Sequence, residues 1–305
     1  MNRVLLFLLA FLSAFSVFSQ QDPQFSQNMF NKLANNAGFS GSRGVIATTF
    51  LHRSQWIGFN DNGAAVSTQN FSVDAAIPLL NGGVGLNIVK DNIAQFSNLG
   101  LQASYAYRTQ LGVGQIGMGM SVGIFQSGLE GGALTPAQSS DPVIPVGDVT
   151  GSQLDIGAGI YFNTQDMYIG ISSAHMTEPT IEWSDGEQYS LERHYFLISG
   201  YYYELNTVFS LNPSIYLKSD GETNQLDINT NLIYNNKMWS GVSYRLNEGL
   251  IVLAGMHITK DLKFGLGYDI TMVNPMGNSL EVMLGYNFKI KTNKAISKYK
   301  NPRFL

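Results

Sequence analysis

Apolar and polar residues alternate along most of this chain of 305 residues. The stretches 116–124 and 225–234 show it most clearly: one set of alternate positions is apolar, the other polar or glycine. A period of two indicates strands with one face towards an apolar phase and the other towards water. About fourteen such stretches follow one another: 43–55, 66–78, 83–90, 96–108, 116–127, 152–162, 167–175, 188–204, 208–218, 224–234, 238–246, 250–258, 262–269 and 280–290.

A sheet within a bilayer must close on itself, because lipid cannot hydrogen-bond an open edge. The series therefore predicts an all-β fold, a transmembrane antiparallel β-barrel of about 14 strands. The connections after even-numbered strands, such as 163–165, are short, while 128–150 and 176–187 are long. Bacterial outer-membrane barrels have short periplasmic turns and long external loops. We expect a multi-pass barrel in the cell outer membrane with both termini periplasmic.

The two ends of the chain differ from the strand series. Residues 1–19 combine Arg3, an apolar run and a small residue before Gln20, as in a removable signal peptide. Residues 20–42 are not strand-like and are predicted to be a periplasmic plug or clasp. The barrel then spans 43–291, and 292–305 form a basic periplasmic tail. Such a tail is usually solvated, with docking to a periplasmic partner or anionic lipid as the alternative.

The plug prediction depends on Phe25, Met29 and Leu33, which recur at four-residue steps. This spacing places apolar side chains along one stripe of a short helix. A stripe of this kind must bury its face against another part of the protein.

Composition excludes several classes of function. Charged residues make up 13% of the chain and the formal net charge is -4, which gives no case for a nucleic-acid partner. The chain has no cysteine, so disulfides and thiolate metal sites are excluded.

The positions of the histidines along the sequence do not indicate an enzyme active site or a cofactor site. The four histidines lie at separate strand ends, and none stands beside a nucleophile and a carboxylate. His175 and His194 can meet across the long fourth external loop, close to Glu178, Asp185 and Glu192, as metal ligands. Polar loop residues also cluster by chance. We favour a solvated loop and predict no metal site.

The predicted lumen face is polar, of mixed sign and rich in asparagine. Such a face suits a plugged lumen or a bound polypeptide at least as well as an open pore, and periodicity leaves both open. Its glycines, including Gly83, Gly117 and Gly159, are interpreted as close-packing positions. The polar residues of this face are Asp74, Arg108, Asp155, Asn212, Lys218, Asp227, Asn229, Asn231 and Glu281.

Three separated segments carry a further signal: 21–31, which reads QDPQFSQNMFN, 53–59, which reads RSQWIGF, and the terminal 301–305, NPRFL. In this order they resemble the PorP/SprF family of the type IX secretion system of Bacteroidetes. The chain departs from the family pattern at 36–41 and 63–65, where expected prolines are absent. The resemblance covers essentially the whole chain.

This resemblance implies a role in protein secretion and gliding motility. Family members support secretion or surface retention of a cargo such as an adhesin, through its carboxy-terminal domain, or work with periplasmic ring components. Outer-membrane lipids are the other expected partners. No small-molecule substrate is expected.

The candidate partner-binding residues are Arg53, Gln55, Trp56, Gly58 and Phe59. Arg53 and Gln55 share one face of a strand, and Trp56 takes the other. We predict that the first two point inward to hold the plug or cargo, and that Trp56 anchors the hairpin in the membrane interface.

The sequence thus predicts a non-enzymatic outer-membrane partner of type IX secretion. Two alternatives differ from it in class. The first is a transporter or channel for small hydrophobic or polar solutes, since such barrels also have about fourteen strands and an N-terminal hatch. The second is a barrel enzyme such as a lipase, which the lack of a local serine and histidine pairing disfavours.

Overall fold

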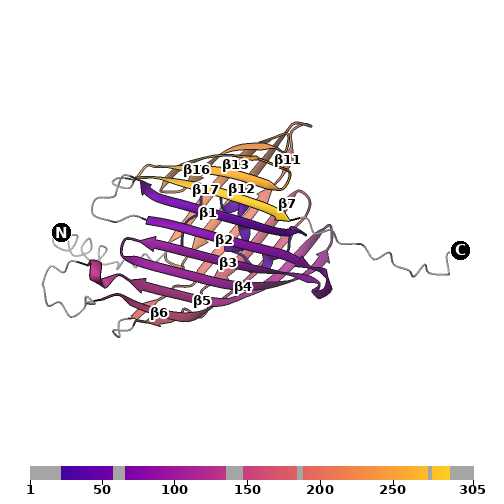
Figure 1. The fold of residues 1–305 in the computed structure, drawn as a ribbon. Coiled ribbons are helices and arrows are strands. Elements are labelled where there is room, and N and C mark those ends of the chain that lie inside the picture. The colour runs from indigo at the N-terminus through magenta and orange to yellow at the C-terminus, as the bar shows by residue number, and fades with distance from the viewer. Residues whose placement is uncertain (1–21, 58–65, 135–146, 184–187, 274–276, 289–305) are drawn as a thin grey trace, which may run out of the picture.

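Fourteen antiparallel strands close into a barrel (Figure 1). The computed structural model describes residues 22–57, 66–134, 147–183, 188–273 and 277–288. Each wall strand pairs with the next along the chain, and β1 pairs with β17 to close the ring. The predicted fold and strand number are confirmed. The wall strands are β1 Ile46–Ile57, β2 Val66–Ile77, β3 Gly82–Ile93, β4 Phe96–Leu111, β5 Gly114–Leu129, β6 Val149–Asn163, β7 Met167–Ala174, β10 His194–Tyr201, β12 Phe209–Ser219, β13 Asn224–Tyr234, β14 Met238–Arg245, β15 Gly249–His257, β16 Leu262–Thr271 and β17 Asn278–Phe288.

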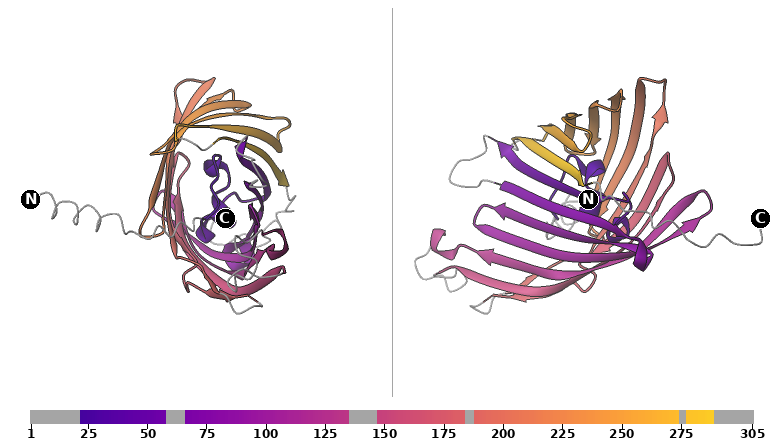
Figure 2. Two further views of the ribbon diagram at one scale, coloured as in Figure 1. Left: turned by 90° about the vertical axis from the view of Figure 1, so that its left-hand side faces the viewer. Right: turned by 45° about the vertical axis from the view of Figure 1, so that its right-hand side comes forward.

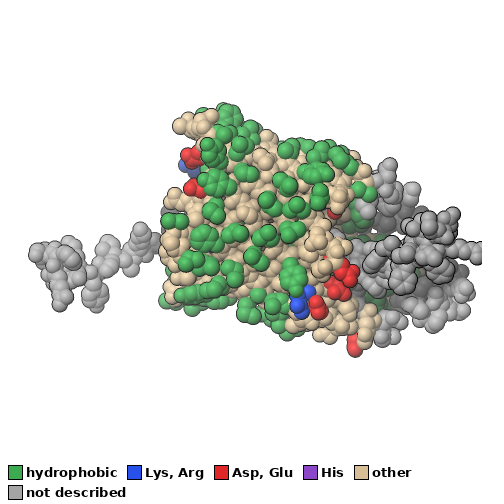
Figure 3. All heavy atoms as spheres, turned by 180° about the vertical axis from the view of Figure 1, so that it is seen from behind, with side chains coloured by type: hydrophobic (Ala, Val, Ile, Leu, Met, Phe, Trp, Pro, Cys, Tyr) green, Lys and Arg blue, Asp and Glu red, His purple; other side chains and the backbone are tan. Residues whose placement is uncertain are grey.

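The outer wall is apolar and the inner wall is polar. On β5, Met120 is 65% exposed while the next residue, Ser121, is 8% exposed. Figure 3 shows hydrophobic side chains over the whole visible wall, with charged side chains only near its two ends. None of the described helices is both long and apolar enough to cross a membrane.

The eighth predicted strand, 188–204, is divided in the structure. Its first part is β9 Gln188–Ser190, which pairs with β8 Thr180–Glu182 in a separate two-stranded sheet. The wall strand β10 begins only at His194, and β11 Tyr203–Glu204 continues it after a break. The side chain of Ile181 on β8 is fully buried. The start of the eighth predicted strand therefore belongs to a separate, packed strand pair at the end of the barrel with the long loops.

Pro213 lies inside β12, although proline is uncommon within a sheet. The pairing of β12 with β13 runs in unbroken register through Pro213 and Thr230. On the other side, the pairing to β10 ends at Ser214 and that to β11 starts at Leu211. Proline has no N–H to donate to a ladder. The break between β10 and β11 falls opposite this missing donor.

Residues 22–45 lie inside the barrel and are called the lumen segment (Figure 2). Three 3₁₀ turns replace the predicted helix: η1 Asn28–Phe30, η2 Lys32–Ala34 and η3 Ala37–Phe39.

Because 3₁₀ turns are short and here interrupted, Phe25, Met29 and Leu33 do not form one stripe. They enter three separate apolar clusters. Phe25 packs with Leu51, Trp239 and Met283; Met29 with Ile251 and Leu253; and Leu33 with Phe39, Tyr161, Phe196, Ile198 and Tyr216.

The described chain enters and leaves the barrel at opposite ends. Asp22 contacts His175 and His194, at the end with the long loops, whereas β17 finishes at the end with the short turns. The expectation that both termini lie on one side was based on strand number and did not include a segment crossing the lumen before β1. The cellular side of each terminus stays a prediction.

The connections between strands are long at one end of the barrel and short at the other, which predicts its orientation in the membrane. We expect tags inserted in 130–148 or 176–187 to be labelled on intact cells by an impermeant reagent, and a tag at 164–166 to be labelled only after permeabilisation. Labelling of the 164–166 tag on intact cells would show that the barrel has the opposite orientation in the membrane.

Candidate functional site

The lumen segment contacts every strand of the wall. Hydrogen bonds, close backbone approaches and apolar packing all contribute. The wall residues involved are Arg53 on β1, Ser72 on β2, Gly85 on β3, Ser104 on β4, Gly117 on β5, Ile160 on β6, Ser172 on β7, His194 on β10, Lys218 on β12, Asp227 on β13, Arg245 on β14, Ile251 on β15, Asp269 on β16 and Glu281 on β17.

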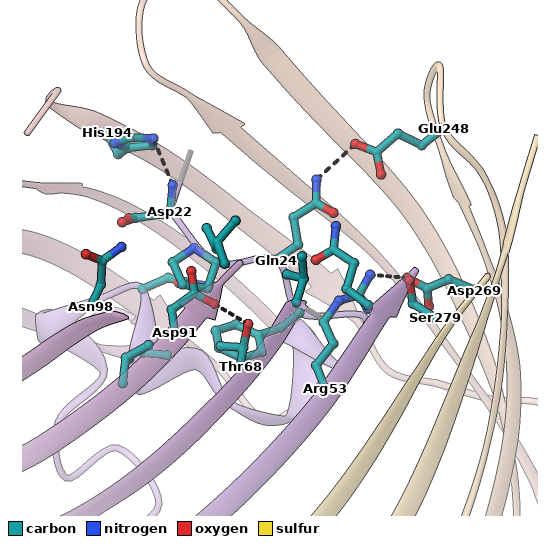
Figure 4. Close-up of a pocket in the computed structure, with 18 of the residues that line it drawn as sticks. Asp22, Gln24, Arg53, Thr68, Asp91, Asn98, His194, Glu248, Asp269 and Ser279 are labelled. Carbon is teal, nitrogen blue, oxygen red and sulfur yellow. Dashed lines mark hydrogen bonds and ion pairs between the residues drawn. The ribbon is translucent and has the colours of Figure 1, made fainter. Parts of the chain in front are cut away.

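Five buried charged residues form the wall network, which surrounds residues 24–28 of the lumen segment. These are Arg53, Asp227, Arg245, Asp269 and Glu281. Arg53 Nη2 lies 2.6 Å from Asp269 Oδ2 (Figure 4), and Arg245 Nη2 lies 2.9 Å from Asp227 Oδ2. Because two guanidinium groups face three carboxylates, carboxylate oxygens remain to accept hydrogen bonds. This part of the wall is therefore suited to hydrogen-bond donors from the lumen segment.

The lumen segment supplies those donors. The backbone N–H groups of Ser26 and Gln27 donate to the two oxygens of Glu281 at 2.7 and 2.8 Å. Ser26 Oγ donates to Asp269 at 2.6 Å and accepts from Arg53 at 2.6 Å. Hydrogen bonds to charged groups are about twice as strong as neutral ones. The wall therefore binds this stretch of polypeptide through its backbone as well as through its side chains.

Asparagine side chains hold the middle of the segment. Asn31 donates to Asn70 Oδ1 and accepts from Ser72 Oγ at 2.7 Å. The amide of Asn36 donates to two wall carbonyl groups, those of Ile160 and Ile171. The asparagine-rich lumen thus holds a folded segment, as the plugged interpretation expected.

Wall glycines allow the segment to approach the backbone of β3, β5 and β6. A Cβ atom added at Gly83 would lie 2.5 Å from Gly41 Cα, and one at Gly117 would lie 2.4 Å from the Gly38 oxygen. Any larger residue at either position would therefore overlap with the backbone of the lumen segment. These contacts confirm the interpretation of the glycines as close-packing positions.

Gly119→Ala should loosen the lumen segment. The added Cβ would lie 2.5 Å from the Ala37 carbonyl group, and overpacking of this kind costs about 1 to 3 kcal/mol. We expect faster trypsin cleavage after Lys32 in a barrel that stays heat-modifiable. Gly100→Ala is the matched control, because its nearest neighbour is 3.8 Å away. Equal cleavage of the two variants would contradict this packing.

Asp22, His175 and His194 meet at the loop end of the lumen. His175 Nε2 lies 3.0 Å from Asp22 Oδ1, and the backbone N–H of Asp22 donates to His194 Nε2 at 3.3 Å (Figure 4). Burial alone favours a neutral His175, but Asp22 and Asp155 outweigh it and raise its pKa to about 10. Burial would raise the pKa of the Asp22 carboxyl, but His175, His194 and Lys218 hold it below its usual value.

The two histidines meet as considered from the sequence, but with a different third residue. Glu178 pairs with Arg193, Glu192 contributes only its carbonyl oxygen, and Asp185 lies outside the described residues. Asp22 is 153 residues from His175 along the chain. Nothing in the local pattern could have indicated it.

A cavity of about 670 Å³ lies beside these residues, between the lumen segment and the wall. It extends from His194 to Arg53 and Asp269 (Figure 4), and His175 also lines it. Its apolar lining includes Val66, Val89, Ile93, Phe96 and Phe125.

The candidate partner-binding residues do not share one location in the structure. Arg53 faces inward and holds the lumen segment, and Gln55 lines the cavity. The prediction that Trp56 points to the membrane interface is wrong. The register to β17 shifts between Ser54 and Ile57, and Trp56 adopts a φ of 55°, so that it lines the same cavity. Gly58 and Phe59 lie outside the described residues, as do the leader, the tail and the terminal motif.

Comparison with solved structures shows the fold. The Ralstonia pickettii toluene transporter TbuX has a TM-score of 0.51 at 11% identity, over 87% of this chain and 94% of that one. CymD, a monoaromatic hydrocarbon channel, has a TM-score of 0.51 at 10% identity, over 88% and 94%. A mutant of the TodX monoaromatic hydrocarbon channel gives 0.50 at 11% identity, over 88% and 95%. At these identities the likeness is one of fold alone.

Comparison by sequence gives the family. No curated protein matches the chain. The family described as "Type IX secretion system membrane protein PorP/SprF" matches residues 17–286, which is most of the sequence and includes the lumen segment and nearly the whole barrel. This outer-membrane barrel therefore belongs to the PorP/SprF family of type IX secretion system membrane proteins.

Proposed function

We propose that this protein is a non-enzymatic partner of type IX secretion that supports secretion or surface anchoring of a cargo protein such as an adhesin. The observation that carries the proposal is a lumen occupied by a polypeptide segment in contact with all fourteen strands. Family membership connects such a barrel to the type IX machinery. A transporter barrel can also hold an N-terminal hatch, so the preference for a protein partner over a solute depends on the family together with the filled lumen.

The loop end is the proposed docking face for cargo. There the cavity and the external hairpin of β8 and β9 lie next to the start of the lumen segment. A carboxy-terminal domain of a cargo protein can contact the hairpin and the cavity mouth together. At the opposite end, short turns leave a compact face for periplasmic ring components.

Cross-linking tests this role directly. The full-length protein, tagged at 164–166, is cross-linked in cells and purified, and bound proteins are identified by mass spectrometry. We expect a cargo protein bearing a type IX sorting domain, cross-linked to residues of 130–148 or 176–187. An unrelated outer-membrane barrel purified in parallel is the control. Recovery of the same proteins with both barrels would contradict the proposal.

The cavity favours one second candidate, a transporter for small hydrophobic or polar solutes. Its apolar lining could hold a small molecule, and the solved structures named above include hydrocarbon channels and a toluene transporter. The lumen segment lies across the path from this cavity to the turn end. Solute uptake by cells that differ only in this protein distinguishes the two functions: transport predicts a loss of uptake on deletion, secretion partnership does not.

A further inference from the structure

We infer that Asp22, His175 and His194 form a binding site for a divalent metal ion of the zinc class at the loop end of the lumen. The site would join the start of the lumen segment to the wall strands β7 and β10. It does not depend on the proposed role in secretion.

The geometry is close to that of a bound metal. One ligand atom from each residue lies within 4.8 Å of the other two. A tetrahedral zinc site, with bonds of about 2.1 Å, separates its ligand atoms by about 3.4 Å. His175 Nε2 and Asp22 Oδ1 already lie 3.0 Å apart, and the other two edges must shorten by at most about 1.4 Å. Both histidines are buried and Asp22 is half-buried.

The second nitrogen of each imidazole has a nearby acceptor. His194 Nδ1 is hydrogen-bonded to the Glu192 carbonyl oxygen at 2.9 Å, and His175 Nδ1 lies at an ion-pair distance of 3.0 Å from Asp155 Oδ2 without forming a hydrogen bond. Metal-binding histidines typically donate their other N–H to a carboxylate or carbonyl, which fixes the tautomer and the ring. His194 has this arrangement, a small rotation would give it to His175, and both Nε2 atoms face Asp22.

Charge around the site fits a divalent cation. The carboxylates of Asp22, Asp91 and Asp155 give a charge of -3. Lys218 contributes one positive charge, and its ammonium group donates to the backbone oxygen of Asp22 at 2.7 Å, so the carboxylate stays available. Metal binding displaces the proton of the His175 imidazolium, and with both imidazoles then neutral the local sum is -2.

The ligand set selects the metal class, and the cavity gives access. Two imidazoles and one carboxylate suit zinc or a neighbouring first-row ion better than calcium or magnesium, which prefer oxygen alone. Asp22, His175 and His194 all line the 670 Å³ cavity, which leaves a fourth position for water. No sulfur ligand is available, since the chain has no cysteine.

Zinc titration of the full-length protein is the test. Protein in detergent is stripped with a chelator and titrated calorimetrically with Zn²⁺, and we expect one equivalent to bind. The variant with His175→Gln and His194→Gln should lose this binding. Asp155→Asn should weaken it by about 10- to 100-fold, as for other residues that orient a ligand. His52→Gln, a change of the same kind outside the cluster, should bind as the wild type does.

Heat-modifiable migration shows whether each variant is folded. A folded wild type that binds no zinc overturns the inference and leaves an ion pair between Asp22 and His175. Equal binding by the folded double variant places zinc elsewhere and also overturns it. If the double variant does not fold, the Co²⁺ spectrum of the wild type decides: tetrahedral bands support the site, and a spectrum of hydrated octahedral ion contradicts it. Unchanged surface cargo in cells that lack the protein would refute only the proposed function, whatever the zinc titration shows.

Discussion

Deleting residues 24–42 should convert a poorly conducting barrel into a steady open pore. The segment carries contacts to all fourteen wall strands, while closure of the ring depends on strand pairing that does not include it. In the deletion variant, the wall network of Arg53, Asp227, Arg245, Asp269 and Glu281 would face water. Water solvates these charges, so we expect the barrel to remain folded. Planar-bilayer recording measures the conductance of both proteins.

A synthetic peptide of residues 22–42 supplies the control for this deletion. Added to the deletion variant, it should lower the conductance, because the wall groups that bind the segment are still in place. A large steady pore in the wild type, or no change on deletion of the segment from a heat-modifiable barrel, would contradict a filled lumen.

The second large effect is expected for Arg53→Ala. Arg53 is 2% exposed and lies 2.6 Å from Asp269 and 3.7 Å from Glu281. Its removal leaves Glu281 without its closest cation and takes a donor from Ser26. Breaking a buried ion pair on one side costs about 3 to 5 kcal/mol. We expect the lumen segment to detach while the barrel stays inserted, with rapid trypsin cleavage after Lys32 and less cargo on the cell surface.

Two further variants define what Arg53 does. Arg53→Lys keeps the charge but loses the planar fork, so its effect should lie between wild type and Arg53→Ala. Gln55→Ala changes a half-buried side chain of the cavity and should leave the segment docked. Loss of the barrel itself in Arg53→Ala would show that the guanidinium supports the wall and not the segment. Normal cargo display with a detached segment would separate docking from secretion.

The sequence predicts the barrel wall well because its signal is local. Alternation of Met118, Met120 and Val122 with small residues depends only on lipid and water on the two faces of one strand. The number of strands follows from repetition of that signal. The lumen polarity follows in the same way, but periodicity alone fits a filled lumen and an open pore equally.

What the sequence could not supply depends on contacts between distant residues. The inward turn of Trp56 results from a register shift against β17, more than 200 residues away. The path of the lumen segment is set by partners on all strands, so its four-residue apolar spacing predicts a helix where three 3₁₀ turns form. Asp22 joins His175 only because the segment crosses the lumen, and no spacing rule could have connected them.

The surface proteome of cells that lack this protein, compared with cells carrying the wild type or Arg53→Ala, tests partnership in secretion most directly. We predict that one or more type IX cargo proteins disappear from the surface on deletion, return with the wild type, and return poorly with Arg53→Ala. General outer-membrane proteins should not change. An unaltered set of surface cargo, together with a loss of small-solute uptake, would contradict partnership in secretion and support a transport barrel.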